Sequence, residues 1–440
     1  MEYLKENREK IIGDLLDCLS IASVSQNRAK TEEALDYVLS LAESMGMESH
    51  KLLDGRVGTV EIGQGTETLG ILVHIDVVDE GDRDLWICDP FKGQVIDGKI
   101  YGRGALDDKG PLIASLHAMK AAMDEERPFT KKVRMIIGTQ EEAEWSDMDE
   151  YVQKYELPDY GFTPDGEFPI CNIEKGCVDA VIRFPIPKSD YNGGGVVIQR
   201  IEGGTAPNVI PGSCKVWLSD GRQIQTLGKA VHSSRPDRGK NAILLMAEKI
   251  ASREFAGDAI AEKMVMIQKR FHDIYGSGIG IYSKNEYYNG EYIHRNVVSP
   301  TMIRTEKGYL ELTLNVRFSY ESTAEEIIAA IEKLCDEEGG YVDSCTSLPA
   351  IYVDRHEPYL EKLAKAYEDQ TDFSNEFSLA YGGSYAKVMK RMVSWGPILP
   401  GMEDTCHEEN EYIEIDDLIT NFRIYYDAIM SIAKSEESFV

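Results

Sequence analysis

Residues 69–78, Leu-Gly-Ile-Leu-Val-His-Ile-Asp-Val-Val, form a nearly continuous apolar run. Such a run is typical of a strand that is buried on both faces of a parallel sheet. Residues 133–138, Val-Arg-Met-Ile-Ile-Gly, predict a second strand of this kind. Helical periodicity covers residues 3–22, 30–46 and 111–123. Because strands and helices alternate here, the first part of the chain is predicted to have an α/β fold.

The order of predicted elements changes after Gly176. Strands are predicted at residues 178–184, 195–201, 214–218 and 309–318, and helices at about 240–255 and 323–338. This order predicts a separate α+β domain over residues 177–348. Helices predicted at 358–369 and 416–433 return to the character of the first part. We therefore expect one domain formed by residues 1–176 and 349–440, with the second domain inserted into it.

Length and charge restrict the class of protein. The chain has 440 residues, which favours two domains over a single core. Asp and Glu number 76 against 47 Lys and Arg, so the formal net charge is −29. An acidic surface repels phosphate backbones and anionic lipids. We therefore expect neither nucleic acid nor a membrane as a partner.

The sequence also favours a cytoplasmic location. The first residues lack the apolar segment of a secretory signal, and no run approaches the ~18 apolar residues that a membrane span requires. The 8 cysteines are scattered without a Cys-x-x-Cys pair. Thiols in this arrangement are typical of a reducing compartment.

Acidic and histidine side chains follow the predicted strands and turns in a fixed order. They are His74, Asp76, Asp107, Asp108, Glu141, Glu142, Asp165 and His407. Open α/β sheets bind ligands beyond the carboxyl ends of their strands. Two imidazoles with several carboxylates are enough to hold two divalent ions and to leave a base over. This set predicts metal-assisted hydrolysis.

Individual positions fit such a site. His74 and Asp76 lie two residues apart on a predicted strand, so both side chains leave the same face, and Asp76 could hold the second ring nitrogen of His74. Asp107 follows the glycine-containing loop 101–104 and could bridge two cations with its two oxygens. Glu141 and Glu142 point in different directions, so one could bind a metal while the other faces a bound water.

Each cluster also has an ordinary structural explanation. The acidic pair at 107–108 could cap the helix that follows, and we expect Asp108 to do so. The pair at 141–142 fits the first turn of a helix. Asp165 lies in a Pro-Asp-Gly turn, and His407 in an acidic loop has the pattern of a surface histidine. A dinucleotide fold is excluded, because the Gly-x-Gly-x-x pattern of the loop ends in Asp107 instead of glycine.

Five segments together resemble a known enzyme family. They are Leu72-Val-His-Ile-Asp-Val-Val, Gly102-Arg-Gly-Ala-Leu-Asp-Asp-Lys-Gly-Pro, Gly138-Thr-Gln-Glu-Glu, Phe162-Thr-Pro-Asp-Gly-Glu-Phe-Pro and Met402-Glu-Asp-Thr-Cys-His-Glu-Glu-Asn-Glu. They are similar to the dinuclear zinc exopeptidases of the aminoacylase and carboxypeptidase G family, and most similar to the PepV-type dipeptidases of bacteria. The resemblance implies a catalytic α/β domain, with a mixed, largely parallel sheet flanked by helices, and an inserted α+β lid of ferredoxin-like type.

The resemblance also implies roles for the site residues. One metal would be held by His74, Asp107 and Asp165, and the other by Asp107, Glu142 and His407. Glu141 would be the general base, and Asp76 would orient His74. The peptide bond between Asp107 and Asp108 would be cis.

Further roles are implied for the inserted domain and a loop after it. His232, in Ala230-Val-His-Ser-Ser-Arg-Pro, would stabilise the oxyanion, and Asn208 would lie near the same oxygen. Arg317 would pair with the terminal carboxylate of the substrate. The loop Gly382-Gly383-Ser384 would offer backbone N–H groups to that carboxylate. On the residues alone, His232 and Arg317 fit surface groups and the glycines fit a plain turn.

The predicted function is metal-dependent hydrolysis of dipeptides by a water activated between two metals. Zn²⁺ is the expected ion, and Mn²⁺ or Co²⁺ suit the same ligands. Two alternatives stay open: an N-acyl amino acid amidohydrolase or desuccinylase, and a metal- or peptide-binding protein that has lost activity. We expect a monomer that acts on small peptides. Residues 271–297 match no motif of the family.

Overall fold

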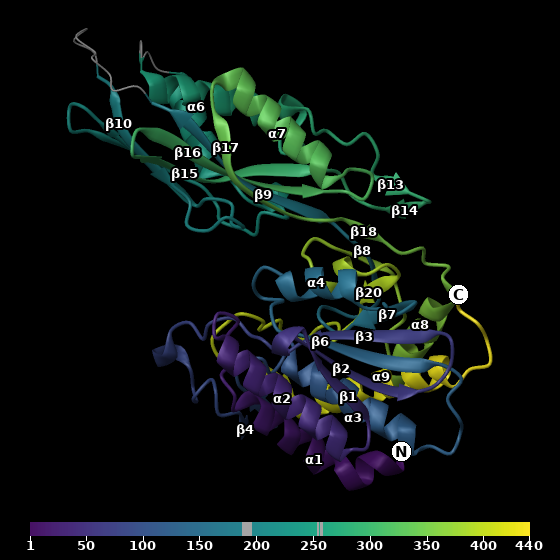
Figure 1. Ribbon diagram of the computed structural model, residues 1–440. Coiled ribbons are helices and arrows are strands. Elements are labelled where there is room, and N and C mark those ends of the chain that lie inside the picture. Colours follow the sequence, from purple (N-terminus) through teal and green to yellow (C-terminus); the bar gives the residue numbers. More distant parts are fainter. Residues whose placement is uncertain (187–195, 253–254, 256–257) are drawn as a thin grey trace. The chain divides into compact units, whose positions relative to one another are not determined.

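The computed structural model describes residues 1–186, 196–252, 255 and 258–440 (Figure 1). The chain divides into two compact units. Unit 1 comprises Met1–Asn172, Val353–Ser378 and Ser384–Val440, and unit 2 comprises Ile173–Tyr352 and Leu379–Gly383. None of the helices in the described ranges is both long and apolar enough to cross a membrane.

The unit boundaries differ from the predicted ones by a few residues. The chain leaves unit 1 at Asn172 and re-enters it at Val353, in place of the predicted 176 and 349. Residues 379–383 were predicted in the first domain, but they group with unit 2. One reason is local, because the N–H of Lys175 donates a hydrogen bond to the carbonyl of Ala380 at 3.0 Å.

Among the described residues, a mixed sheet of nine strands forms the centre of unit 1, although its last strand, Ile351–Tyr352, consists of residues grouped with unit 2. Its order is β1 (Glu48–Leu52), β2 (Val57–Gly63), β6 (Lys132–Gly138), β3 (Thr68–His74), β7 (Tyr160–Thr163), β20 (Met392–Ser394), β8 (Cys171–Glu174) and β18 (Ile351–Tyr352), with β19 (Ser378–Ala380) paired to β8. The strands β6, β3, β7 and β20 run parallel to one another, and their neighbours on both sides are antiparallel. The carboxyl ends of β6, β3 and β7 therefore meet at one edge.

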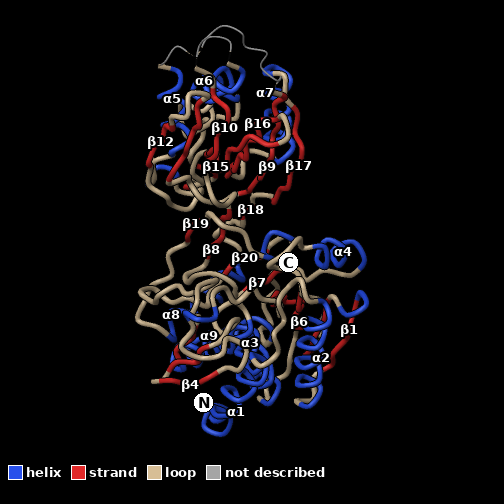
Figure 2. The backbone as a smooth tube through the Cα atoms, turned by 90° about the vertical axis from the view of Figure 1, so that its left-hand side faces the viewer, coloured by secondary structure: helices blue, strands red, loops and turns tan. Residues whose placement is uncertain are grey.

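Six helices of the described chain surround this sheet: α1 (Glu2–Leu19), α2 (Arg28–Ser44), α3 (Lys109–Asp124), α4 (Ser146–Lys154), α8 (Pro358–Gln370) and α9 (Ile415–Ala433). The helix α3 is buried on almost every side, which explains its apolar sequence. It packs against α1, α9 and the sheet, and α3 and α9 lie side by side (Figures 1 and 2). A small sheet of β4 (Gln94–Ile96), β5 (Lys99–Tyr101) and β21 (Tyr412–Glu414) completes the unit.

The strand β3 is shorter than predicted. It ends at His74, whereas the apolar run continues to residue 78. The N–H of Ile75 still donates to the carbonyl of Gly138 in β6, but beyond Ile75 the partner changes. The N–H of Val77 donates to the carbonyl of Ser23, and the N–H of Ser25 donates to the carbonyl of Val77. Asp76 therefore follows the strand and is not part of it.

In the part of unit 2 that the structure describes, seven strands form an antiparallel sheet. Its order is β12 (Gln223–Leu227), β11 (Ser213–Leu218), β10 (Ile198–Gly203), β15 (Val297–Glu306), β16 (Tyr309–Phe318), β9 (Gly176–Pro185) and β17 (Tyr341–Leu348). The helices α5 (Ala242–Ala251), α6 (Ala259–Arg270) and α7 (Ala324–Glu338) pack on it, and a hairpin of β13 (Tyr287–Tyr288) and β14 (Glu291–Tyr292) follows α6. The helix α6 was not predicted, and Gly195, predicted to begin a strand, lies outside the described residues.

Capping residues explain where the helices of unit 2 begin. Asn241 and Asp258 accept hydrogen bonds from the first N–H groups of α5 and α6. Thr323 and Glu326 form a reciprocal capping box at the start of α7, and Gly339, with φ of 72°, ends that helix. Each feature uses a residue type that satisfies unpaired backbone groups at a helix end.

Packing between α3 and α9 predicts a stability effect. Ile429 is fully buried on α9. Changing Ile429→Ala should destabilise unit 1 by about 2–5 kcal/mol, because methyl and methylene groups are lost and a cavity remains. The measurement is urea denaturation, and Arg423→Ala on the exposed side of the same helix is the control. Equal stability of the two variants would contradict this role of the α9 face.

Candidate metal centre

His74 occupies the last position of β3, and its side chain is 1% exposed. Its N–H donates to Asp108 Oδ2 at 3.1 Å. Its ring Nδ1 lies 3.0 Å from the main-chain carbonyl of Asp76 and 3.6 Å from Asp76 Oδ1. We predicted that the carboxylate of Asp76 holds the ring, but its main-chain carbonyl makes the shorter contact. The imidazole is thus oriented with Nε2 pointing away from β3.

The carboxylate of Asp76 holds a different part of the site. It accepts hydrogen bonds from the N–H groups of Glu141 and Glu142, each at 3.2 Å, and from Ser25 Oγ at 2.6 Å. Asp76 is fully buried. Its negative charge therefore fixes the backbone of the Glu141–Glu142 turn that follows β6.

Two groups of side chains converge at the edge where β3, β6 and β7 end. One group consists of His74, Asp107 and Asp165, and the other of Asp107, Glu142 and His407. The nitrogen and oxygen atoms of each group lie within 4.8 Å of one another. These are the two ligand sets that the resemblance implied, and the structure brings both together from distant parts of the chain.

Asp107 is shared by the two groups through different oxygens. Its Oδ1 lies 3.0 Å from His74 Nε2, and its Oδ2 lies 3.0 Å from His407 Nε2. His407 Nε2 also lies 2.7 Å from Glu142 Oε1, and His74 Nε2 lies 3.8 Å from Asp165 Oδ2. A carboxylate with one oxygen toward each imidazole has the arrangement required of a bridging ligand.

The donor set fits a pair of divalent cations. His74 Nε2 is buried and makes no hydrogen bond within the described chain, although it lies 3.0 Å from an oxygen of Asp107. A buried nitrogen without a hydrogen bond is costly unless a ligand satisfies it. Mixed imidazole and carboxylate ligands suit Zn²⁺, Mn²⁺ or Co²⁺.

Electrostatics agree with this fit. Contacts with Asp107 and Glu142 raise the pKa of His407 to about 11, against the opposing effect of partial burial. Burial alone would raise the pKa of Asp107, but the close contacts with His407 and His74 and the positive charge of their rings hold that pKa below its usual range. In the metal-free protein the imidazolium charges therefore offset the carboxylates, a role that bound cations would take over.

Glu141 belongs to neither ligand group in the structure. Burial raises its pKa well above the usual range, and the nearby charge of Asp165 adds to this effect. Trp145 Nε1 donates to the main-chain carbonyl of Glu141 at 2.6 Å. Glu141 is thus a carboxyl group beside the ligands with a raised proton affinity.

We predicted that the side chain of Asp108 caps α3, and this prediction was wrong. Asp108 occupies the N-cap position, but its side chain makes no capping hydrogen bond. Its Oδ2 instead accepts the N–H of His74. The peptide bond between Asp107 and Asp108 is cis, as the resemblance implied.

Asp147 and Tyr385 were missed by the sequence analysis. Asp147 Oδ2 accepts the N–H groups of Thr139 and Gln140 at 2.7 and 3.2 Å, and Tyr385 Oη donates to the same oxygen at 2.8 Å. The Tyr385 ring meets the edge of the His74 ring, with 6.3 Å between centroids. Gly138 admits this tyrosine, since an added Cβ would lie 2.4 Å from its ring.

Asn208 and His232 of unit 2 lie next to each other. The N–H of Ser233 donates to the carbonyl of Asn208 at 2.8 Å, and Val209 and His232 form an antiparallel bridge. His232 Nδ1 accepts the N–H of Ser234 at 3.2 Å and lies 2.6 Å from the hydroxyl of Ser234. The proton of a neutral His232 ring therefore resides on Nε2.

Arg317 lies beside the glycine loop within unit 2. It is on β16, is 8% exposed, and donates to the carbonyl of Tyr381 at 3.4 Å and to Asn315 Oδ1 at 3.4 Å. Both of these acceptors are uncharged oxygens. Gly382 and Gly383 belong to unit 2, whereas Ser384 belongs to unit 1, where its Oγ accepts the N–H of Ala386.

The segment 271–297 also reaches the Tyr381 loop. His294 packs edge-on against Tyr381, with 5.5 Å between ring centroids, and Tyr292 packs against His294 at 5.7 Å. Lys175 Nζ lies 3.1 Å from His294 Nδ1. The segment that matched no motif therefore contributes aromatic and basic side chains next to the Arg317–Tyr381 contact.

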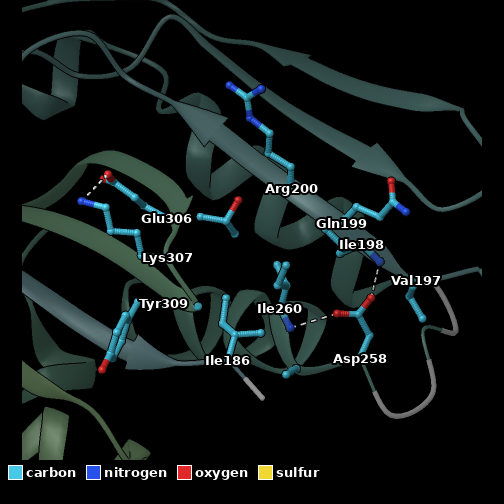
Figure 3. Close-up of a pocket in the computed structure, with 13 residues that line it drawn as sticks. Ile186, Val197, Ile198, Gln199, Arg200, Asp258, Ile260, Glu306, Lys307 and Tyr309 are labelled. Atoms are coloured by element: carbon cyan, nitrogen blue, oxygen red, sulfur yellow. Dashed lines mark hydrogen bonds and ion pairs between the residues drawn. The ribbon is translucent and has the colours of Figure 1, made fainter. Parts of the chain in front are cut away.

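A separate cavity of about 610 Å³ lies in unit 2 (Figure 3). It is lined by parts of β10, the start of α6 and the turn between β15 and β16. Its Asp258 is already occupied as the cap of α6, where Oδ1 accepts two N–H groups. Among the residues described around this cavity, none is a predicted site residue.

Comparison with known proteins identifies the family. The model of Peptidase family M20/M25/M40 matches residues 70–431. The chain belongs to this peptidase family. It is 31% identical to the protein named "Putative dipeptidase YtjP" of Bacillus subtilis, over 97% of this chain and 98% of that protein. It is 30% identical to "Putative dipeptidase SH1171" of Staphylococcus haemolyticus, over 98% of both chains.

Solved structures agree on the fold. The M20 family metallo-carboxypeptidase Sso-CP2 from Sulfolobus solfataricus aligns with a TM-score of 0.65 at 16% identity, over 95% of this chain and 98% of that one. The di-peptidase Dug1p from Saccharomyces cerevisiae aligns with a TM-score of 0.63 at 14% identity, over 99% and 98%. The fold of this M20 enzyme is thus the predicted mixed α/β fold.

The Tyr385–Asp147 hydrogen bond predicts a measurable stability effect. Changing Tyr385→Phe removes a hydroxyl donor from a buried carboxylate, which should destabilise unit 1 by about 1–3 kcal/mol. Thermal unfolding measures the effect, and Tyr155→Phe, at an exposed position, is the control. An unchanged unfolding temperature for the Tyr385 variant would show that Asp147 is held without this hydroxyl.

Proposed function

We propose that this M20 enzyme is a metal-dependent dipeptidase that releases free amino acids. The observation that carries the proposal is the carboxylate of Asp107, which places Oδ1 3.0 Å from His74 and Oδ2 3.0 Å from His407. Glu141 lies outside both ligand groups. The relatives named as dipeptidases support the same substrate class.

The proposed cofactors are two divalent ions, with Zn²⁺ expected and Mn²⁺ or Co²⁺ compatible. His74, Asp107 and Asp165 would hold one ion, and Asp107, Glu142 and His407 the other. A relative of the same fold, YXEP of Bacillus subtilis, is described as a dinuclear metal binding peptidase, which supports this number. Bound ions would polarise the scissile carbonyl and lower the pKa of the attacking water to about 7.

Glu141 is proposed as the general base. Burial raises its pKa, so its carboxylate accepts a proton readily from a water of lowered pKa. It would then pass this proton to the leaving amine. Asp76 serves this step indirectly, since its carboxylate fixes the N–H of Glu141 and its main-chain carbonyl contacts the ring of His74.

Unit 2 is proposed as the substrate-binding lid. Burial and the charge of Arg317 lower the pKa of His232, which keeps its ring neutral with the proton on Nε2. That N–H, with Asn208 beside it, is suited to donate to an oxyanion. Among the described residues, the nearly buried guanidinium of Arg317 donates to uncharged oxygens, so it is suited to bind a carboxylate. Arg317 and the loop of Gly382, Gly383 and Ser384 are therefore proposed to receive the terminal carboxylate of the substrate.

Removal of the base should separate chemistry from metal binding. In Glu141→Ala, turnover of dipeptides should fall at least about 10²–10⁴-fold, because no group takes the proton of the water. The chelated protein should still take up two ions per chain when metal is returned stepwise. Glu144→Ala, at a neighbouring exposed position, should keep full activity. Hydrolysis that persists in the Glu141 variant would exclude the proposed base.

Removal of Arg317 should affect only substrates with a free carboxylate. In Arg317→Met, kcat/KM for a dipeptide should fall about 10–100-fold, since charge-assisted hydrogen bonds contribute about 1.5–3 kcal/mol. The same dipeptide with an amidated C-terminus should lose little. Arg304→Met, on the same sheet and paired with Glu311, is the matched control. N-acyl amino acids belong in the same assay, because faster turnover of these would favour an amidohydrolase.

Two further parts of the proposal concern the state of the protein. We propose a monomer, because in the PepV-type dipeptidases that the chain resembles a long lid completes the site within one chain. We propose a cytoplasmic location, for which the scattered cysteines are the support.

A further inference from the structure

Glu411 is a buried carboxylate that the proposed mechanism does not use. It is 0% exposed and immediately precedes β21. Tyr412 pairs with Tyr101 in the β21–β5 ladder, and the main-chain carbonyl of Glu411 accepts the N–H of Gly102 at 3.1 Å. The ladder therefore delivers the side chain of Glu411 to the loop that leads to Asp107.

The two carboxylate oxygens of Glu411 accept hydrogen bonds from three backbone N–H groups and one side chain of that loop. Oε1 accepts the N–H groups of Leu106 and Asp107 at 2.8 and 3.1 Å. Oε2 accepts the N–H of Gly104 at 2.9 Å and Arg103 Nη1 at 2.8 Å. The Arg103 guanidinium, 2% exposed, balances the charge of Glu411 beside the carboxylate of Asp107.

The same carboxylate is linked by a short segment to the second histidine. His407 lies four residues before Glu411. Thr405 Oγ1 accepts the N–H of Tyr412 at 3.3 Å and lies 3.4 Å from its carbonyl oxygen, which closes the loop that contains both His407 and Glu411. Glu411 thus ties the loop bearing one ligand to the loop bearing the shared ligand.

We propose that Glu411 is a positioning residue of the metal centre, whose carboxylate fixes the backbone of residues 104–107 so that Asp107 meets His74 and His407 with separate oxygens. This inference rests on the proposed two-metal function. It assigns Glu411 no contact with metal or substrate. Groups that orient metal ligands in this way typically affect metal affinity about 10–100-fold when they are changed.

The test compares Glu411→Gln with a matched control variant elsewhere in unit 1. An amide at residue 411 places an NH₂ group against N–H donors, so the loop must shift. The matched control is Glu67→Gln, since Glu67 also accepts several hydrogen bonds, from Tyr160 Oη, Ser438 Oγ and the N–H of Phe439. Glu67 lies just before β3, at the opposite end of that strand from His74.

Zn²⁺ affinity is measured by titration of the chelated full-length protein, and the ligand geometry by the absorption spectrum after Co²⁺ loading. We expect Glu411→Gln to bind Zn²⁺ about 10–100-fold more weakly and to change the Co²⁺ spectrum. Glu67→Gln should lower thermal stability and leave both metal properties as in the wild type. If Glu411→Gln does not fold, Glu411→Asp, which withdraws the carboxylate by one methylene, is measured in the same way with the same expectation.

The outcomes separate this inference from the proposed function. Wild-type Zn²⁺ affinity and an unchanged Co²⁺ spectrum in a folded Glu411 variant would overturn the positioning role. An equal loss of affinity in Glu67→Gln would also overturn it, because general destabilisation would then explain the effect. If the wild-type protein itself bound no metal, the proposed function would fail first.

Discussion

The crowding of carboxylates at the carboxyl ends of β3, β6 and β7 is the constraint on which the rest of the site depends. Like charges this close raise one another's pKa values unless cations or hydrogen-bond donors stabilise them. Asp107 is stabilised by two imidazoles, whereas burial and neighbouring carboxylates raise the pKa of Glu141. One cluster therefore contains both a carboxylate with a lowered pKa, Asp107, and carboxyl groups with raised pKa values, Glu141 and Glu142.

A second set of buried carboxylates holds the backbone around the ligands. Its members bind main-chain N–H groups of the loops that bear the ligands, and they are Asp76, Asp108, Asp147 and Glu411. Burial raises the pKa values of Asp108, Asp147 and Glu411, and the hydrogen bonds from backbone N–H groups act against this effect. Two kinds of acidic side chain are thus present at the site. The candidate metal ligands face imidazoles and would face cations, whereas the supporting carboxylates accept hydrogen bonds from backbone N–H groups.

The two groups of candidate metal ligands could be predicted from the sequence, but the side chains that support their loops could not. His74, Asp107 and His407 lie at strand ends or in loops whose order matches a family pattern. Asp147 and Glu411 meet backbone donors that come together only after folding, and 307 residues separate Glu411 from Gly104. Asp76 itself was predicted only as a contact of the His74 ring. Its carboxylate accepts the N–H groups of Glu141 and Glu142, which lie 65 and 66 residues away in the sequence. Local spacing contains no information on such distant pairs.

The two units differ in the charge of their functional groups. The groups of unit 1 are mainly carboxylates that would hold cations, whereas those of unit 2 are a neutral imidazole and a buried guanidinium. In a chain with a net charge of −29, an anionic substrate is repelled at long range. Arg317 would offset this locally, because a guanidinium shielded from water interacts more strongly with a carboxylate than an exposed one does. The proposed recognition of a free C-terminus would therefore depend on this nearly buried guanidinium, and the sheet of unit 2 is the scaffold that keeps it buried.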